Sequence, residues 1–282
     1  MYRHLLKCCL VALALSLRIT ELAQADYDYT TLNVPGGSPT LAQGINDAGQ
    51  IVGFYFEASR EHGFLREADG TYTTLDVPGA RYTSASGING SGQIVGFYGS
   101  FGGDHGFLRD VDGTYTTLDL PGAINTYPQA INDLGQIVGQ CDGVHGFVLD
   151  ADGTYTLFDV PGAYRTVATG INGSGQIVGY YEDPVVHGFL LDADGTLTPL
   201  DFPGATATSA AGINRYGQIV GGYRDSSGRD SGFLLNIDGT YTPFAVPGAL
   251  DTDAYGINDA GQSVGYYWEG AGEPQAFVAT PQ

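Results

Sequence analysis

The stretch Gly-Ile-Asn-Gly-Ser-Gly-Gln-Ile-Val-Gly occupies residues 87–96 of this 282-residue chain, and close variants of it recur along almost the whole length. The variants occupy residues 44–53, 130–139, 170–179, 212–221 and 256–265. In chain order, successive copies start 43, 43, 40, 42 and 44 residues apart. A period in this range is typical of a repeat architecture in which each unit is one supersecondary element.

Each repeat is expected to form four antiparallel strands, as the second repeat illustrates. A glycine-rich turn separates its first two strands, and Ile94-Val95 gives the second strand β-branched side chains. Pro121-Gly122 ends the fourth strand, because proline cannot donate a ladder hydrogen bond. The four expected strands are residues 83–89, 93–98, 105–110 and 114–120. Six such units of about 42 residues predict an all-β fold, a six-bladed β-propeller.

The two ends of the repeat region predict how the ring closes. Residues 29–34 align with the fourth strand of a repeat, whereas residues 275–278 align with the third. The last repeat therefore lacks a fourth strand, and the N-terminal segment has one to spare. We expect the N-terminal strand to complete the last blade, because this pairing removes an exposed sheet edge.

The first 25 residues are typical of a secretory signal peptide. A short basic segment, residues 2–7, precedes an apolar run at residues 8–17, and Ala23-Gln24-Ala25 fits the small-residue cleavage rule. The apolar run is too short to span a bilayer, which needs roughly 20 residues. We therefore predict a signal peptide at residues 1–25, a single propeller domain at residues 26–282, and a secreted protein, extracellular or periplasmic.

The composition excludes several classes of partner. Removal of residues 1–25 takes away three basic residues and one acidic residue, which changes the formal net charge from −20 to −22. Such a surface repels nucleic acid and anionic membranes. Only Cys141 remains after cleavage, so no intrachain disulfide is expected and stability must come from packing.

The repeats resemble an extracellular family, the HAF family, named for a His-Ala-Phe motif. The matching tripeptides are His62-Gly63-Phe64, His105-Gly106-Phe107, His145-Gly146-Phe147, His187-Gly188-Phe189, Ser231-Gly232-Phe233 and Gln275-Ala276-Phe277. The Gly-Ile-Asn phrase is also similar to the pattern of that family, and the likeness covers nearly all of the chain after residue 25. The resemblance implies bacterial export and a propeller, but it implies no activity and no catalytic residues.

One asparagine per repeat stands at a strand end before a glycine-containing turn. The six are Asn46, Asn89, Asn132, Asn172, Asn214 and Asn258. Asparagine favours such positions because its side chain can bond the turn backbone. The alternative is a polar ring around the axial channel that holds water or an ion.

The motif Asp-x-Asp-Gly, or a variant of it, recurs at a second turn. Its acidic pairs are Asp110/Asp112, Asp150/Asp152 and Asp192/Asp194, with Glu67/Asp69 and Asn236/Asp238 as variants. A hairpin turn with glycine at positive φ accounts for the motif. Weak calcium binding is the alternative, although calcium prefers six to eight oxygen ligands. No other cofactor is expected.

The histidines His62, His105, His145 and His187 share one position of the repeat. Equivalent residues of a six-fold ring are separated by its radius, which is at least roughly 10 Å for the third strand. Zinc ligands each lie about 2.0–2.1 Å from one ion, so a shared zinc site is disfavoured. We expect each imidazole to bond a backbone group or border an interblade groove, with ligand contact as the alternative.

The residues that vary from one repeat to the next are the best candidates for function. The loops between strands two and three and the connections between blades are expected on one face, and both are variable. This loop face offers aromatic rings beside charged groups, which suit ring packing and polar contacts with a carbohydrate or protein ligand. The predicted ligand-binding residues are Tyr82, Tyr164, Tyr181, Trp268, Arg81, Arg165, Glu182 and Glu269.

Two classes of function follow. The first is a binding or structural module for an extracellular carbohydrate or protein. The second is a glycan-active hydrolase or lyase that uses loop-face carboxylates, for which Glu57, Glu182 and Glu269 are candidates. A glycosidase needs two carboxylates about 5–9.5 Å apart, so their disposition separates the two hypotheses. No catalytic or metal-binding residue is assigned, because no motif supports one.

Overall fold

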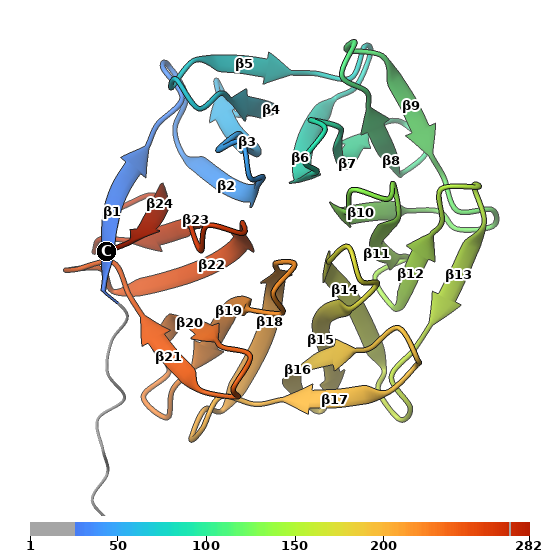
Figure 1. Ribbon diagram of the computed structural model, residues 1–282. Helices are drawn as coiled ribbons and strands as arrows, with labels where there is room; N and C mark the ends of the chain where they lie inside the picture. The colour runs from blue at the N-terminus through green and yellow to red at the C-terminus, as the bar shows by residue number, and fades with distance from the viewer. Residues whose placement is uncertain (1–25, 271) are drawn as a thin grey trace, which may run out of the picture.

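The computed structural model describes residues 26–270 and 272–282 as six blades of four antiparallel strands around a central axis (Figure 1). Blade 1 consists of β2 (Thr40–Ile45), β3 (Ile51–Glu57), β4 (Arg60–Arg66) and β5 (Tyr72–Leu75). Blade 2 consists of β6 (Tyr82–Ile88), β7 (Ile94–Gly99), β8 (Asp104–Arg109) and β9 (Tyr115–Leu118). Blade 3 consists of β10 (Thr126–Ile131), β11 (Ile137–Cys141), β12 (His145–Leu149) and β13 (Tyr155–Phe158).

The second half of the chain repeats the same order. Blade 4 consists of β14 (Arg165–Ile171), β15 (Ile177–Asp183), β16 (Val185–Leu191) and β17 (Leu197–Leu200). Blade 5 consists of β18 (Ala207–Ile213), β19 (Ile219–Arg224), β20 (Asp230–Leu235) and β21 (Tyr241–Phe244). Blade 6 consists of β22 (Asp251–Ile257), β23 (Ser263–Trp268), β24 (Gln275–Pro281) and β1 (Tyr27–Leu32). The expected all-β propeller is therefore confirmed.

The ring closes through the N-terminal strand, as the sequence predicts. β1 pairs antiparallel with β24, with Leu32 opposite Ala276, and the two strands lie side by side in Figure 1. Leu32 is only 2% exposed and belongs to the hydrophobic core. A single parallel bridge between Thr40 and Gln275 also joins blade 6 to blade 1. The expected signal peptide, residues 1–25, lies outside the described residues.

The repeated residues are those that hold the blades together. The phenylalanine of the third strand, such as Phe107, is fully buried in every repeat. Gly96 allows this packing, because a Cβ there would lie 2.0 Å from the Ser84 carbonyl oxygen and 2.9 Å from the Phe107 ring. The turn glycine Gly92 has φ of 86°, a conformation that glycine adopts without strain. The Gly-Gln-Ile-Val-Gly phrase is thus explained by local architecture.

A threonine near the start of each innermost strand fixes the segment that connects one blade to the next. Its Oγ1 accepts a hydrogen bond from the backbone N–H six residues earlier, as Thr83 does from Val77 at 3.1 Å. The equivalent threonines are Thr40, Thr126, Thr166, Thr208 and Thr252. All six connections between blades are therefore held by the same hydrogen bond.

No helix in the described residues has the length and apolar character needed to cross a bilayer.

Candidate functional site

The six repeated asparagines form a closed ring of hydrogen bonds around the axis. Each is buried, and its Nδ2 donates to the backbone carbonyl of the corresponding asparagine in the next blade, at 3.0–3.3 Å. The last bond, from Asn258 to Asn46, completes the circle. Each Oδ1 also accepts bonds from the hairpin turn, so the expected turn role is confirmed. The alternative role in holding water or an ion stays a prediction.

The Asp-x-Asp-Gly turns are hairpins stabilised by their own side chains. In five repeats the second aspartate accepts a 2.9 Å bond from the N–H of the threonine two residues on, and this bond lowers the pKa of Asp112 and its equivalents. The following glycine has positive φ, 89° at Gly113. Within the described ranges, no three side chains of the metal-binding types gather. The geometry supports the hairpin interpretation, and weak calcium binding stays a prediction.

The four histidines each bind a carboxylate that directly follows the adjacent fourth strand. The Nδ1 of His62, His105, His145 and His187 lies 2.8–2.9 Å from an oxygen of Asp76, Asp119, Asp159 and Asp201, respectively. Several of the rings also pack on a tyrosine of the second strand, as His187 does on Tyr181 at 5.2 Å between centroids. The expected backbone partner is therefore wrong, because each imidazole binds a carboxylate instead. Ligand contact, the alternative, stays a prediction.

The innermost strands carry a feature that the repeat phrase alone does not reveal. In all six, the pairing with the second strand shifts register just before the Gly-Ile-Asn phrase, for example between Ala85 and Gly87. A β-bulge of this kind leaves one residue unpaired and redirects its side chain. The six bulge residues line the axial channel: Gln43, Ser86, Gln129, Thr169, Ala211 and Tyr255.

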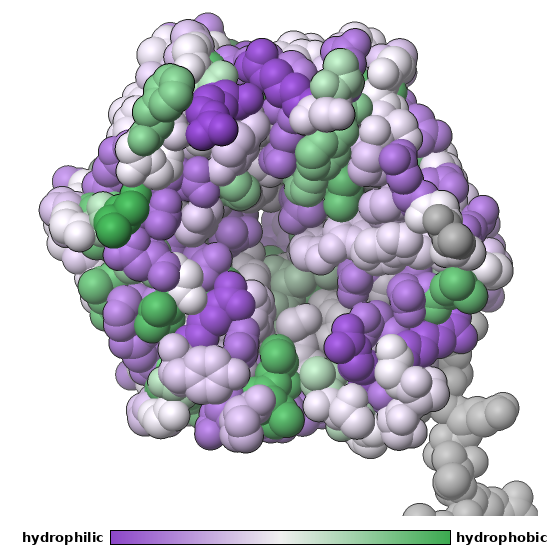
Figure 2. Space-filling model, turned by 180° about the vertical axis from the view of Figure 1, so that it is seen from behind, coloured by the Kyte–Doolittle hydropathy of each residue, from purple (hydrophilic) through white to green (hydrophobic). Residues whose placement is uncertain are grey.

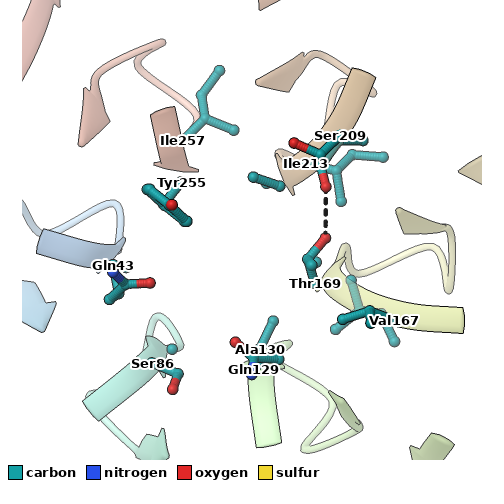
Figure 3. A pocket seen from close by; sticks show the side chains of 18 of the residues that line it. Gln43, Ser86, Gln129, Ala130, Val167, Thr169, Ser209, Ile213, Tyr255 and Ile257 are labelled. Carbon is teal, nitrogen blue, oxygen red and sulfur yellow. Dashed lines mark hydrogen bonds between the residues drawn. The ribbon is translucent and has the colours of Figure 1, made fainter. Parts of the chain in front are cut away.

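These bulge residues surround an axial cavity of about 530 Å³. Figure 3 shows Gln43, Ser86, Gln129, Thr169 and Tyr255 arranged around an open centre. Toward the asparagine ring, the wall is made by one isoleucine from each blade: Ile45, Ile88, Ile131, Ile171, Ile213 and Ile257. In the space-filling view from the side opposite to Figure 1, the molecule is hollowed at its centre (Figure 2). The cavity thus combines an apolar base with varied polar groups above it.

Blade 4 contributes a cluster of charged and aromatic groups to this cavity. Arg165 Nη1 donates to Glu182 at 2.8 Å, and its guanidinium lies 5.5 Å from the centroid of the Tyr180 ring. Glu182 and Tyr180 line the cavity. The nearby Glu182 carboxylate also raises the pKa of the Tyr164 phenol. The Arg165 Nε is buried and has no hydrogen-bond partner in the described chain.

Blade 6 carries an unpaired carboxylate near Ser209, one of the residues that line the cavity. Asp253 is partly buried, and no hydrogen bond joins its carboxylate to another described residue. Burial, followed by the charges of Asp230 and Asp251, raises its pKa to about 6. Gly222 makes room for it, because a Cβ there would lie 2.8 Å from Asp253 Oδ1. Other blades carry larger residues at the Gly222 position, such as Phe97 and Tyr180, so this gap is specific to blade 5.

A second acidic group lies between blades 1, 2 and 3. The Asp104 carboxylate accepts hydrogen bonds from the hydroxyls of Tyr82 and Tyr127, the latter at 2.8 Å. Burial raises the pKa of the nearby Glu61, and the charge of Asp104 adds to the effect. Phe97 packs edge-on against Tyr127, with centroids 5.1 Å apart. Tyr82 is therefore held within this cluster.

The predicted site residues fall into three groups on the ring. Blade 4 brings together Tyr164, Arg165 and Glu182 as described above, whereas Tyr181 packs on His187. In blade 2, Arg81 lies 5.8 Å from the Phe101 ring centroid. In blade 6, the Trp268 ring meets Tyr266 edge-on and Glu269 is exposed. Backbone hydrogen bonds, such as Tyr164 N–H to Glu182 O at 3.1 Å, confirm that the connections between blades and the loops after strand two lie on one face.

Of the three glutamates proposed for glycosidase chemistry, Glu182 is part of the cavity wall, while Glu57 and Glu269 are exposed. The bulge residues and Asp253 are not among the site residues predicted from the sequence. The signal that could have found the bulge residues is the variable residue x in the phrase Ala-x-Gly-Ile-Asn, which blade 3 replaces with Pro-x-Ala-Ile-Asn. The identity of this residue changes from blade to blade, although its neighbours are the same in the other five blades.

Comparison with known proteins establishes the fold but no family. No protein-family model matches the chain, and no curated protein gives a significant match. Among solved structures, an inactive virginiamycin B lyase from Staphylococcus aureus with quinupristin is similar at 15% identity and TM-score 0.55, covering 91% of this chain and 89% of that one. A gluconolactonase from Xanthomonas campestris is similar at 15% identity and TM-score 0.52, covering 93% and 97%. TolB from Acinetobacter baumannii is similar at 15% identity and TM-score 0.58, covering 84% and 65%.

Proposed function

We propose that this protein is a secreted binding module that takes a neutral, hydroxyl-rich ligand, of the carbohydrate class, in the axial cavity. The observation that carries the proposal is the distribution of the repeat. Residues that hold the blades together are the same six times, whereas the residues around the cavity, such as Gln43, Thr169 and Tyr255, differ. Variation on a rigid scaffold is where a binding site is expected.

The chemistry of the cavity favours such a ligand. Gln43, Gln129 and Ser209 can donate and accept hydrogen bonds, and Tyr180 and Tyr255 add aromatic surface. The Thr169 hydroxyl donates to the Ala210 carbonyl and can accept a further bond. The volume of about 530 Å³ falls in the range of small-molecule sites, roughly 300–1,000 Å³. Glu182 and the formal net charge of −20 disfavour anionic ligands.

The location is part of the proposal. The segment before residue 26 has the sequence features of a signal peptide, and the repeats resemble those of the exported HAF family. An extracellular or periplasmic protein meets polysaccharide fragments and the surface proteins of its own cell. A binding module for a protein ligand on the loop face is therefore a second version of the same proposal.

A second candidate function rests on Asp253. A carboxylate with a pKa of about 6 can serve as a general base near neutral pH. Asp253 has no hydrogen-bond partner among the described residues, and it lies near the cavity residue Ser209. Lyases and a gluconolactonase are among the solved structures that share this fold. We therefore keep a glycan-active hydrolase or lyase as the alternative, with Asp253 as its base.

The test combines a glycan array with a polysaccharide-hydrolysis screen on the full chain. Ala211→Trp fills the cavity, and Ala151→Trp places the same ring on an exposed hairpin as a matched control. We expect the cavity variant to weaken binding at least about 100-fold and the control to leave it unchanged. Full binding by Ala211→Trp, or no binding to any glycan, would contradict the proposal. Product release that Asp253→Asn abolishes would favour the enzyme instead.

A further inference from the structure

Blade 2 differs from the other blades in what its histidine touches. In blades 1 to 4 a histidine of the third strand binds, through Nδ1, an aspartate that directly follows the fourth strand. In blade 2, His105 Nε2 also lies 2.9 Å from the hydroxyl oxygen of Ser100. Within the described ranges, no other of these histidines has a serine hydroxyl on Nε2. Ser100, His105 and Asp119 therefore form a continuous chain of hydrogen bonds.

The partners fix the direction of these bonds. The Asp119 carboxylate can only accept, so it takes the Nδ1–H of His105 at 2.9 Å. The Nε2 atom is then the basic nitrogen, and the Ser100 hydroxyl donates to it. A serine whose proton is held by a histidine, itself oriented by a carboxylate, is the arrangement that activates an oxygen nucleophile.

Short-range contacts hold the serine in place. Ser100 begins the tight turn between β7 and β8, closed by a 3.0 Å bond from its N–H to the Gly103 carbonyl. The Gly102 N–H lies 3.2 Å from Ser100 Oγ. This hydrogen bond helps to hold the hydroxyl oxygen beside His105 Nε2. The His105 ring packs on Tyr98, with centroids 5.3 Å apart, which limits its rotation.

The surroundings indicate the kind of substrate. Phe101 follows Ser100 directly and is 100% exposed, and Ile124 is 70% exposed. The backbone at Gly103 lies against Ile124, where a Cβ would be 2.5 Å from the Ile124 carbonyl oxygen. Two exposed apolar side chains are thus part of the serine turn or of the segment that packs against it. Such a surface suits a small apolar acyl group, and the acidic charge of the chain disfavours anionic substrates.

We propose that Ser100, His105 and Asp119 form a nucleophilic serine site on the loop of blade 2 that hydrolyses small, activated esters of apolar acids. Ser100 Oγ bonds to the carbonyl carbon while its proton passes to His105 Nε2. The alcohol leaves with that proton, and an acyl-serine remains. Water then gives a proton to Nε2 and attacks the acyl carbon. The carboxylic acid leaves, and Ser100 Oγ recovers its proton from Nε2.

The test uses labelling of the full chain by a fluorophosphonate probe, with the modified peptide identified by mass spectrometry, together with the hydrolysis rate of p-nitrophenyl acetate. We expect the label on Ser100. Ser100→Ala should reduce the labelling rate to background, about 100-fold or more, and Asp119→Asn should reduce it about 10-fold or more, with unchanged melting temperatures.

Blade 3 supplies the matched control. His145 and Asp159 form the same Nδ1 pair, at 2.9 Å, without a serine on the ring. His145→Ala should leave both labelling and ester hydrolysis unchanged. Absence of label, label on another serine, or an equal loss in His145→Ala would each overturn the proposal. These outcomes are independent of ligand binding in the axial cavity.

Discussion

The same six innermost strands line both halves of the axial channel. In one half the residue is the same in every blade, whereas in the other half it varies from blade to blade. On the hairpin side, one asparagine is repeated six times, and each binds the next across the blade boundary. On the loop side, the bulge residues are two glutamines, a serine, a threonine, an alanine and a tyrosine. A closed ring of hydrogen bonds requires the same donor and acceptor at every position, whereas a cavity wall does not. The residues that stabilise the ring and the residues that line the cavity thus lie at different heights along the axial channel.

The largest expected effect comes from opening the ring on which both halves depend. Deleting residues 26–35 removes β1, with the buried side chains of Leu32 and Val34, and leaves blade 6 with three strands. We expect the melting temperature to fall by about 10 °C or more, because lost apolar burial and an exposed strand edge both destabilise the chain. Differential scanning calorimetry measures the shift. A truncated chain that melts at the full-length temperature would contradict strand closure.

The next largest effect compares a residue of the asparagine ring with a residue of the cavity wall in the same blade. Asn132→Ala removes four hydrogen bonds of a buried side chain, to Leu134, Gln136 twice and Asn172. We expect a loss of about 2–4 kcal/mol in the free energy of unfolding. Gln129→Ala, three residues away and facing the cavity, should change it by less than about 0.5 kcal/mol. Urea denaturation of both variants gives the comparison, and equal losses would show that the halves do not differ.

The smallest effect concerns Asp253 on the loop side. Its folded pKa of about 6 exceeds the ordinary value of 3.8, so the folded state binds the proton more tightly than the unfolded state. Stability therefore falls as the pH rises from about 4 to 6 and stays lower above it. Asp253→Asn should raise the free energy of unfolding at pH 8 by on the order of 2 kcal/mol and leave it unchanged at pH 3.

Asp112→Asn provides the control of opposite sign. The pKa of Asp112 is lowered by the Thr114 backbone bond, so its contribution is present above the unfolded pKa and is lost on acidification. This variant should weaken the fold at pH 8, where Asp253→Asn strengthens it. Unfolding curves from pH 3 to 8 measure both trends. A destabilising Asp253→Asn at pH 8 would show that the carboxylate serves the fold and is not reserved for a ligand.

Much of the architecture follows from the repeat. The expected second-blade strands at residues 83–89, 93–98 and 105–110 agree within one residue with β6, β7 and β8, because glycine turns and β-branched runs are local signals. The fourth strand is shorter than residues 114–120 and ends at Leu118. There the chain departs for the next blade, where Thr126 accepts the Leu120 N–H. That contact joins two repeats, and no short-range sequence pattern predicts it.

The partners of the histidines show a similar limit. The four occupy one position of the repeat, and all four bind an aspartate carboxylate. The partner itself, an aspartate 14 residues later, depends on the register between the third and fourth strands. Only in blade 2 does the preceding loop also bring a serine to the ring, because that turn returns Ser100 toward His105. Loop conformation is not encoded in the repeat pattern.

By itself, the sequence determined the number of blades, their strand order and the closure by the N-terminal strand. These follow from periodicity and from short-range preferences of glycine, proline and β-branched residues. Tertiary structure alone decided which variable residues face the axis. Alternation along a strand fails at the β-bulge, so Gln129 or Tyr255 reaches the channel through a register shift that only the paired strand defines. The cavity, and with it the candidate site, exists because six bulges converge at one height on the ring.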